Sequence, residues 1–378
     1  MPKLRGKPTM RARIFVFLVA LVAASMLLLT GPARASADSV NTAQRTVTKL
    51  ADGVYVIRHK DAPDTFPQGN TTVVIGESGV LVVDSCYLPS TAREDIAQIK
   101  HWTNLPVRYV FNTHWHMDHN YGNVAYAEAF PGVTIVSQAQ TAKMMALREP
   151  AELTDYQKGI AAYQQQYDTG KDAAGQPLSE LGKADLKTAI AGSAAVWKEF
   201  QNLKPRYPDL TFEHELDLDL GGRTVELKFL GRGNTSGDAV AYLPKEKILA
   251  TGDLVDHPVP YLGGGFPAEQ ISTLERLKAI DADILVPGHG DVLHGKEYVQ
   301  LEIDFLTAVV GAVDQYILGN GAGAKRHLEE LRKFVETTID MPAWRQKFAG
   351  DDADARDFFD SFSGPGVVDA AHAELWPR

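Results

Sequence analysis

The sequence holds a single cysteine, Cys86, among its 378 residues. One thiol excludes an intramolecular disulfide and any metal cluster built on several thiolates. Cys86 ends the apolar stretch VLVVDSC, which is typical of a β-strand, so we expect a buried small residue and not a reactive thiol. The chain also lacks a G-x-S-x-G motif, so no serine nucleophile of the α/β-hydrolase type is indicated.

Positive charge is scarce beyond the first 37 residues. That segment holds six of the 38 basic residues and none of the 48 acidic ones, so the rest of the chain has a net charge of −16. Proteins that bind nucleic acids usually carry a basic patch or stripe. The acidic balance therefore argues against a nucleic-acid partner.

Residues 1–37 have the three-part pattern of a secretory signal peptide. A basic stretch precedes an apolar run of 17 residues, and GPARASA then offers cleavage sites after Ala35 and Ala37. An uncleaved anchor helix is the alternative, although the run is short for a membrane span and the small residues favour cleavage. No cysteine stands at the cleavage site, which argues against a lipoprotein. We expect a periplasmic or secreted protein with no stable membrane insertion after cleavage.

The rest of the chain predicts an α+β protein. Short β-branched runs separated by turns dominate from residue 45, and a helix is expected at 91–103. Residues 139–204 have helical spacing and contain neither His nor Cys, so we expect a helical insertion that shapes or covers a pocket without supplying an imidazole ligand. The organisation expected is a catalytic domain over 45–300, this insertion within it, and a helical C-terminal extension over 301–378.

Three local predictions concern the second half of the chain. Alternation of apolar and acidic residues over 212–220 predicts one half-buried strand, which would place His214 on its apolar side as a core residue. Apolar residues recur every four positions from Leu301 to Val313, which predicts a packed helix face. The acidic segment GDDADARD is expected to form a solvated turn.

The strongest chemical signal is THWHMDHN, which follows a predicted strand. It places His114, His116, Asp118 and His119 within six residues. Alternation along an extended chain puts the first two imidazoles on one side, where both can bind one ion, and the next two residues turn toward a second position. Imidazole and carboxylate ligands suit zinc and are also used by iron and manganese. The motif therefore predicts a metal site.

With this motif and those that follow it, the sequence resembles the metallo-β-lactamase-fold superfamily over roughly residues 45–300. The resemblance implies an αβ/βα sandwich of two mixed sheets with helices outside. It also implies that Asp84 supports the metal loop, that Asp253 in ATGDL bridges two metals, and that His289 in PGHG binds the second metal. The TGD and PGHG forms are similar to the glyoxalase II-like and general hydrolase branches, whereas true β-lactamases usually have Cys or Ser where this chain has Asp253.

The chain departs from the family pattern at Asn234. The resemblance places the third histidine of the first metal site there, and an amide oxygen is a weak, neutral ligand for zinc. Asn234 can coordinate weakly, hold a water or bind nothing, and His257, four residues after Asp253, is an alternative ligand. The outcomes left open are a binuclear site with a weakened first metal, a single metal in the second position, and a site without catalytic metal.

The function that these residues indicate is metal-assisted hydrolysis of a small molecule. We expect one or two zinc ions, with iron or manganese as alternatives, to activate water for attack on an ester, thioester, lactone or amide-type bond, including a β-lactam, or on a sulfate or phosphate ester. By resemblance, Asp118 also orients the nucleophile. A sulfur dioxygenase-like iron enzyme and a non-catalytic zinc- or ligand-binding protein remain as other classes. Oligomeric state is not indicated.

Overall fold

The computed structural model describes residues 44–173, 175–320 and 328–376. The signal peptide expected at 1–37 lies outside these residues. Among the described residues, no helix combines the length and apolar character needed to cross a membrane.

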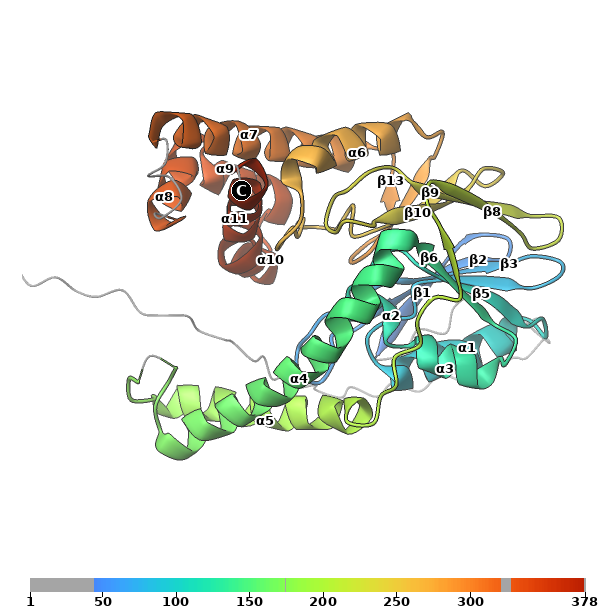
Figure 1. Ribbon diagram of the computed structural model, residues 1–378, viewed down its shortest axis with the longest axis horizontal. Coiled ribbons are helices and arrows are strands. Elements are labelled where there is room, and N and C mark those ends of the chain that lie inside the picture. Colours follow the sequence, from blue (N-terminus) through green and yellow to red (C-terminus); the bar gives the residue numbers. More distant parts are fainter. Residues whose placement is uncertain (1–43, 174, 321–327, 377–378) are drawn as a thin grey trace, which may run out of the picture.

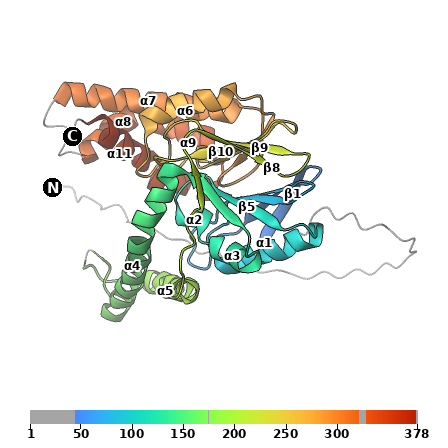
Figure 2. The same cartoon turned by 45° about the vertical axis from the view of Figure 1, so that its right-hand side comes forward.

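Two mixed β-sheets stack face to face, and helices cover both outer faces (Figure 1, Figure 2). In the first sheet the seven strands lie in chain order, antiparallel from β1 to β4 and parallel from β4 to β7. Its strands are β1 (Arg45–Ala51), β2 (Val54–His59), β3 (Thr71–Ile75), β4 (Val80–Val83), β5 (Val107–Asn112), β6 (Thr134–Gln138) and β7 (Leu210–Phe212). This arrangement confirms the predicted sandwich.

The second sheet has six strands in the order β13-β12-β11-β10-β9-β8. All neighbours are antiparallel except β11 and β12, which run parallel. The strands are β8 (Glu215–Asp219), β9 (Thr224–Phe229), β10 (Ala239–Leu243), β11 (Ile248–Gly252), β12 (Ile284–Pro287) and β13 (Leu293–His294). Each sheet thus contains parallel neighbours, and parallel strands end at the same edge of a sheet.

The core follows these layers. One apolar cluster, with Val83, Phe111 and Leu227 among its members, fills the space between the sheets. A second cluster lies between the first sheet and the helices beneath it, and a third joins the second sheet to α6 and the C-terminal helices. The helices of the sandwich are α1 (Pro89–Trp102), α2 (Met117–Asn120), α3 (Asn123–Ala129) and α6 (Pro267–Ala279). Proline at the first turn of α1 and of α6 suits a helix start, because the missing N–H would have no helical partner there.

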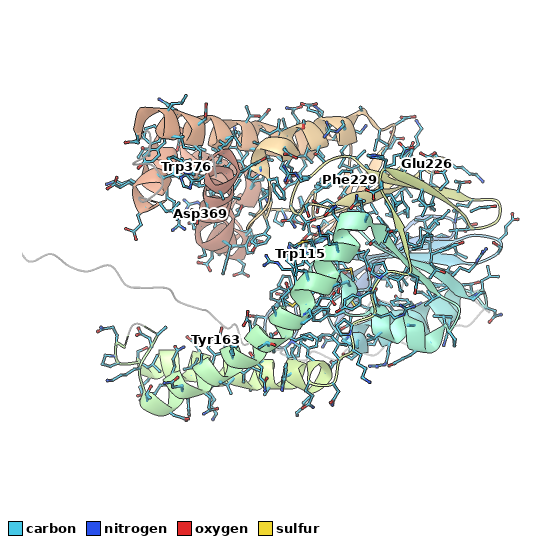
Figure 3. All side chains as sticks on the ribbon, viewed as in Figure 1. Trp115, Tyr163, Glu226, Phe229, Asp369 and Trp376 are labelled. Atoms are coloured by element: carbon cyan, nitrogen blue, oxygen red, sulfur yellow. The ribbon has the colours of Figure 1, made fainter. Side chains whose placement is uncertain are left out.

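Residues 139–204 contain the helical hairpin of α4 (Ala139–Thr169) and α5 (Glu180–Phe200). The hairpin extends away from the sandwich (Figure 1), and Tyr163 lies on its outer part (Figure 3). Gly170 ends α4 in a left-handed conformation, and the Ser179 side chain caps α5 by accepting from the Gly182 amide. An aromatic cluster that includes Phe200 and Tyr121 joins the base of the hairpin to the segment that carries the predicted ligands His114 to His119.

Helices dominate the C-terminal region. They are α7 (Glu297–Asn320), α8 (Leu328–Thr338), α9 (Met341–Ala349), α10 (Ala353–Phe358), the π-helix η2 (Phe359–Ser363) and α11 (Gly364–Leu375). The predicted apolar face of α7 is packed, since Phe305, Val309 and Val313 are fully buried. The domain boundary expected between residues 300 and 301 falls inside α7.

Two local predictions were wrong. The stretch 212–220 is not one strand, because β7 belongs to the first sheet and β8 to the second. His214 lies in the crossing between them and is exposed, because the chain leaves the strand geometry there. The acidic segment GDDADARD is only partly a turn, since Asp352 caps the amides of Asp354 and Ala355 and so starts α10.

Candidate metal centre

The predicted ligands meet where parallel strands of the two sheets end. Asp84 follows β4, and the segment from His114 to His119 follows β5, its parallel neighbour. Asp253 and His289 follow β11 and β12, the parallel pair of the second sheet. Residues far apart in the sequence therefore converge at one edge of the sandwich.

The first ligand group consists of His114, His116 and Asp253. The Nε2 atom of His114 lies 3.2 Å from Oδ2 of Asp253, and Nδ1 of His116 lies 4.0 Å from the same oxygen. The His114 side chain is fully buried, and its Nε2 has no hydrogen-bond partner among the described residues. A buried ring nitrogen that faces a carboxylate oxygen without a well-formed hydrogen bond is the arrangement expected of two ligands of one metal.

The second ligand group consists of Asp118, His119 and His289. The two imidazole Nε2 atoms are 3.1 Å apart, and Oδ2 of Asp118 lies 3.0 Å from the His289 nitrogen and 3.5 Å from that of His119. Asp253 reaches this group as well, because its Oδ1 lies 3.1 Å from His119 Nε2. Ligand atoms bound at roughly 2.0–2.1 Å to one tetrahedral ion are about 3.3 Å apart, so the residues present fit a transition-metal ion.

Asp84 supports both ligand groups through hydrogen bonds. Its Oδ2 accepts a hydrogen bond from Nδ1 of His119 at 2.9 Å and from the Thr113 hydroxyl at 2.8 Å, and the Thr113 amide donates to its Oδ1. The Thr113 hydroxyl also lies 3.0 Å from Nδ1 of His114. When one ring nitrogen is engaged in this way, the other is directed at the metal position.

Asn234 lies at the first ligand group, as the resemblance implied. Its Nδ2 is 3.3 Å from Oδ2 of Asp253 and 3.4 Å from Nδ1 of His116. Its Oδ1 is buried and has no hydrogen-bond partner among the described residues. The amide therefore lies beside two of the three residues of the first ligand group.

The charged groups of the centre shift one another's pKa values. Burial opposes ionisation of Asp253, but His119 and the neighbouring imidazoles hold the pKa of this carboxyl well below its ordinary value. Burial likewise opposes protonation of His119, yet Asp253 and Asp118 raise the pKa of its imidazole well above the ordinary value. The carboxylates are thus ionised at neutral pH, and the centre attracts positive charge of the kind that a metal ion supplies.

Two glycines leave the space that side chains of the two ligand groups occupy. A side chain at Gly69 would overlap the His119 ring, and one at Gly288 would overlap the Asp253 carboxylate. The Gly69 amide donates to the carbonyl of Asp118 at 3.1 Å, so the backbone itself braces the metal loop. Any residue larger than glycine would displace a ligand at these positions.

His257 lies beside the centre and outside both ligand groups. Its ring packs against Tyr298, with ring centres 5.1 Å apart, and burial lowers the pKa of its imidazole. Its backbone amide donates to the carbonyl of His289 at 3.2 Å. The structure thus places His257 as a backbone support of the His289 loop.

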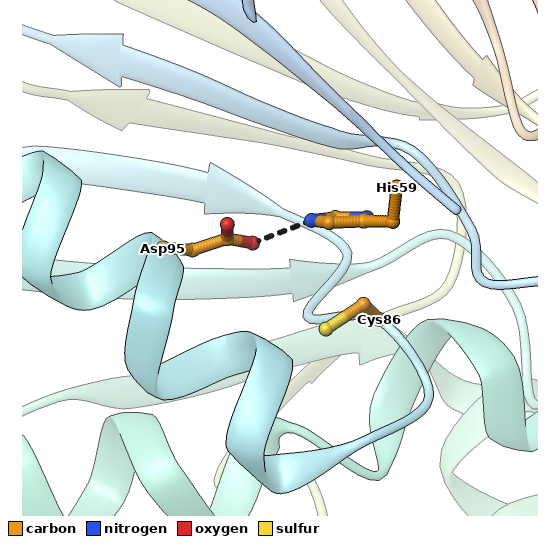
Figure 4. Close-up of side chains that lie close together, drawn as sticks. All are labelled: His59, Cys86 and Asp95. Atoms are coloured by element: carbon orange, nitrogen blue, oxygen red, sulfur yellow. Dashed lines mark hydrogen bonds and ion pairs between the residues drawn. The ribbon is translucent and has the colours of Figure 1, made fainter. Parts of the chain in front are cut away.

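A second cluster brings Cys86 close to His59 and Asp95, which sequence reasoning left unassigned (Figure 4). Both ring nitrogens of His59 are engaged, since Nδ1 lies 2.9 Å from the carbonyl of Gly69 and Nε2 lies 2.9 Å from Oδ2 of Asp95. Cys86 is fully buried, as predicted, and burial raises the pKa of its thiol. With no free imidazole nitrogen and no ionised thiol, this cluster braces the Gly69 loop and leaves no metal ligand free.

Sequence reasoning missed three buried or half-buried acids near the centre. Asp256 lies within reach of the second ligand group, and Glu149 and Glu152 of α4 lie on the His116 side. Arg148 of the same helix stacks over Trp115, 5.3 Å from the ring centre, and Trp115 lies beside α4 (Figure 3). Only the spacing of Asp256, three residues after Asp253, offered a signal.

The sandwich and its paired ligand groups define a metal-dependent hydrolase fold with a site at one sheet edge. The model of the metallo-beta-lactamase superfamily matches residues 64–289, more than half of the chain, and the protein belongs to this superfamily. A solved metallo-beta-lactamase from Pontibacter korlensis has the same fold, with a TM-score of 0.51 and 21% identity, covering 70% of this chain and 99% of its own.

Two curated relatives are sulfatases. The linear primary-alkylsulfatase of a Pseudomonas species is 23% identical over 240 residues, which cover 59% of this chain and 41% of the relative. The alkyl/aryl-sulfatase BDS1 of Saccharomyces cerevisiae is 34% identical over 77 residues, which cover 20% of this chain and 11% of the relative. The chain thus matches less than half the length of each of them.

Proposed function

We propose that the protein is an exported metal-dependent hydrolase that cleaves sulfate esters of alkyl or aryl alcohols. The hydrolase assignment rests on one observation, the two ligand groups that share Asp253. The substrate class is supported by the names of the two curated relatives. Export is supported by the signal-peptide pattern of residues 1–37.

The metal and the residues of the chain would have separate roles in the reaction. A bound transition metal supplies a nucleophile from water at neutral pH and stabilises negative charge on the ester. Asp118 is ionised because His119 and His289 overcome the effect of burial and hold its pKa well below the ordinary value. Its Oδ2 is directed at these two imidazoles, which leaves Oδ1 to orient the attacking water by a hydrogen bond.

An aromatic strip beside the centre suits an apolar substrate tail. Tyr261 lies close enough to Asp118 and Asp253 for their charges, after burial, to raise the pKa of its phenol. Its ring centre is 6.1 Å from that of Phe358, which is 5.6 Å from that of Phe362. Phe358 and Phe362 are 36% and 56% exposed, so an alkyl or aryl group would cover apolar surface there.

The test is a substrate panel with metal-replete protein of the full mature chain. Dodecyl sulfate and 4-nitrophenyl sulfate are compared with a carboxylic ester, a thioester, a lactone, a phosphodiester and nitrocefin. We expect release of inorganic sulfate, and a loss of at least about a hundredfold in kcat for Asp118→Asn, because the variant loses the charged group that orients the nucleophile. Turnover of another substrate with inert sulfates would refute the substrate class, and an inert panel at full metal occupancy would favour a non-catalytic protein.

A further inference from the structure

Asp256 is a buried carboxylate beside the second ligand group. It lies in the loop that follows β11, three residues after Asp253, and its side chain is 5% exposed. One of its carboxylate oxygens, one of Asp253 and a ring nitrogen of His289 all lie within 4.8 Å of one another. These three residues therefore form a candidate ligand group for one ion.

The backbone holds Asp256 in this place. The Tyr298 hydroxyl of α7 donates to the Asp256 carbonyl at 2.6 Å, and the amide of the next residue, His257, donates to the carbonyl of His289. The loop is thus fastened both to a helix of the outer layer and to the segment that carries a predicted ligand. The backbone at Asp256 is consequently held in place, and one of the two contacts joins it directly to His289.

The hydrogen bonding of the Asp256 carboxylate is incomplete within the described part of the chain. Its Oδ1 is buried without a hydrogen-bond partner among the described residues. A buried oxygen without a partner is the state expected of a metal ligand, and residues of the second ligand group lie beside Asp256.

We propose that Asp256 is an oxygen ligand of the metal in the second position. The proposal rests on the metal centre and not on the substrate assigned above. The second position would then draw on two imidazoles, His119 and His289, and on three carboxylates, Asp118, Asp253 and Asp256. So many hard oxygen ligands suit five or six ligands around the ion and make iron or manganese acceptable there beside zinc.

The same residue explains how the chain tolerates Asn234. The first position keeps two imidazoles and the shared Asp253 and is the weaker one, whereas the second gains a carboxylate. We therefore expect the first equivalent of metal to enter the second position.

The test uses the full mature chain, stripped of metal and titrated with Co²⁺. Asp256→Asn keeps the shape of the side chain and removes its charge, and Glu302→Gln does the same for a neighbouring buried acid that stands outside the ligand groups. We expect Asp256→Asn to bind the first equivalent at least about tenfold more weakly in competition with a chelator. Its visible absorption should also rise, because Co²⁺ with fewer ligands absorbs more strongly. Glu302→Gln should keep both the affinity and the spectrum.

Wild-type affinity and spectrum in Asp256→Asn would overturn the proposal. Equal weakening in both variants, with unchanged spectra, would overturn it too, since that result reports general electrostatics. Circular dichroism of the metal-free proteins checks folding, and Asp256→Ser replaces Asp256→Asn if the latter does not fold. An enzyme inactive on sulfate esters whose metal binding depends on Asp256 would leave this inference standing and refute the proposed function alone.

Discussion

At the scale of single residues, Asn234 sets the difference between the two metal positions. Its amide nitrogen lies within 3.4 Å of both Asp253 and His116, so an imidazole at residue 234 would face an ion bound in the first position. In Asn234→His we expect the second equivalent of zinc to bind at least about tenfold more tightly, the effect of one stronger ligand. Chelator competition measures this change. Unchanged affinity would mean that the first position does not use residue 234.

A second residue-scale prediction concerns Asp84. This carboxylate accepts from His119 and Thr113, and it therefore orients ligands of both groups. Loss of such a support typically weakens metal binding by about 10- to 100-fold, and we expect Asp84→Asn to fall in this range when zinc affinity is measured by chelator competition. The matched control is Asp238→Asn, because Asp238 is equally buried but accepts from the Thr235 amide. Equal losses in both variants would contradict the orienting role.

At the scale of elements, the sequence could predict which residues the structure brings together wherever they are local or end a strand. His114 to His119 lie within six residues, and Asp84, Asp253 and His289 each follow a short apolar strand. The prediction of one strand over 212–220 failed because alternation of apolar and acidic residues shows which side of a strand is apolar. It does not show to which sheet the strand belongs. Glu149 was missed because its burial arises from packing between distant elements, which leaves no local pattern, whereas for Asp256 the spacing from Asp253 was the only local signal.

The inner half of α4 yields a prediction about pH. Glu149 is fully buried, and burial raises the pKa of its carboxyl to about 8. The folded state therefore holds a proton that the unfolded state releases near its ordinary pKa of about 4.3, so the wild-type free energy of unfolding falls as pH rises from about 4.3 to 8. Glutamine cannot ionise. We expect Glu149→Gln to gain stability over wild type by a few kcal/mol (~2–4) between pH 5 and pH 8.

Urea unfolding followed by tryptophan fluorescence at pH 5, 6.5 and 8 measures this difference. Glu180→Gln is the control, because Glu180 starts the neighbouring helix α5 with its side chain 92% exposed. A constant difference between wild type and Glu149→Gln across this range would show that Glu149 ionises normally in the folded protein.

At the scale of the whole molecule, the C-terminal helices are tied to the loop that carries Asp253. The Ser363 hydroxyl of η2 donates to the Pro260 carbonyl at 2.5 Å, and the carboxylate of Glu374 accepts from the first amides of α6. These helices lie at the same end of the molecule as α6 (Figure 1, Figure 2). The C-terminal region is therefore in a position to take part in substrate selection.

Substitution of Phe362 tests this role. The side chain is 56% exposed and continues the aromatic strip that starts at Tyr261. Loss of about 1–2 kcal/mol of apolar contact in Phe362→Ser corresponds to a rise of about 5- to 30-fold in KM for dodecyl sulfate. Ethyl sulfate has no long tail to lie along Phe362, so its KM should not change, and kcat should be retained for both.

Leu318→Ser supplies the matched control for the steady-state comparison. Leu318 is an apolar residue of α7 that is 77% exposed and outside the aromatic strip. It reports any general effect of removing apolar surface from this region, including altered detergent binding. A parallel rise in KM in this control, or an equal change for ethyl sulfate in Phe362→Ser, would show that the strip does not bind the tail. A rise confined to the long substrate and to Phe362→Ser would place the alkyl chain against the C-terminal helices, because only that variant shortens the surface that extends from the metal centre.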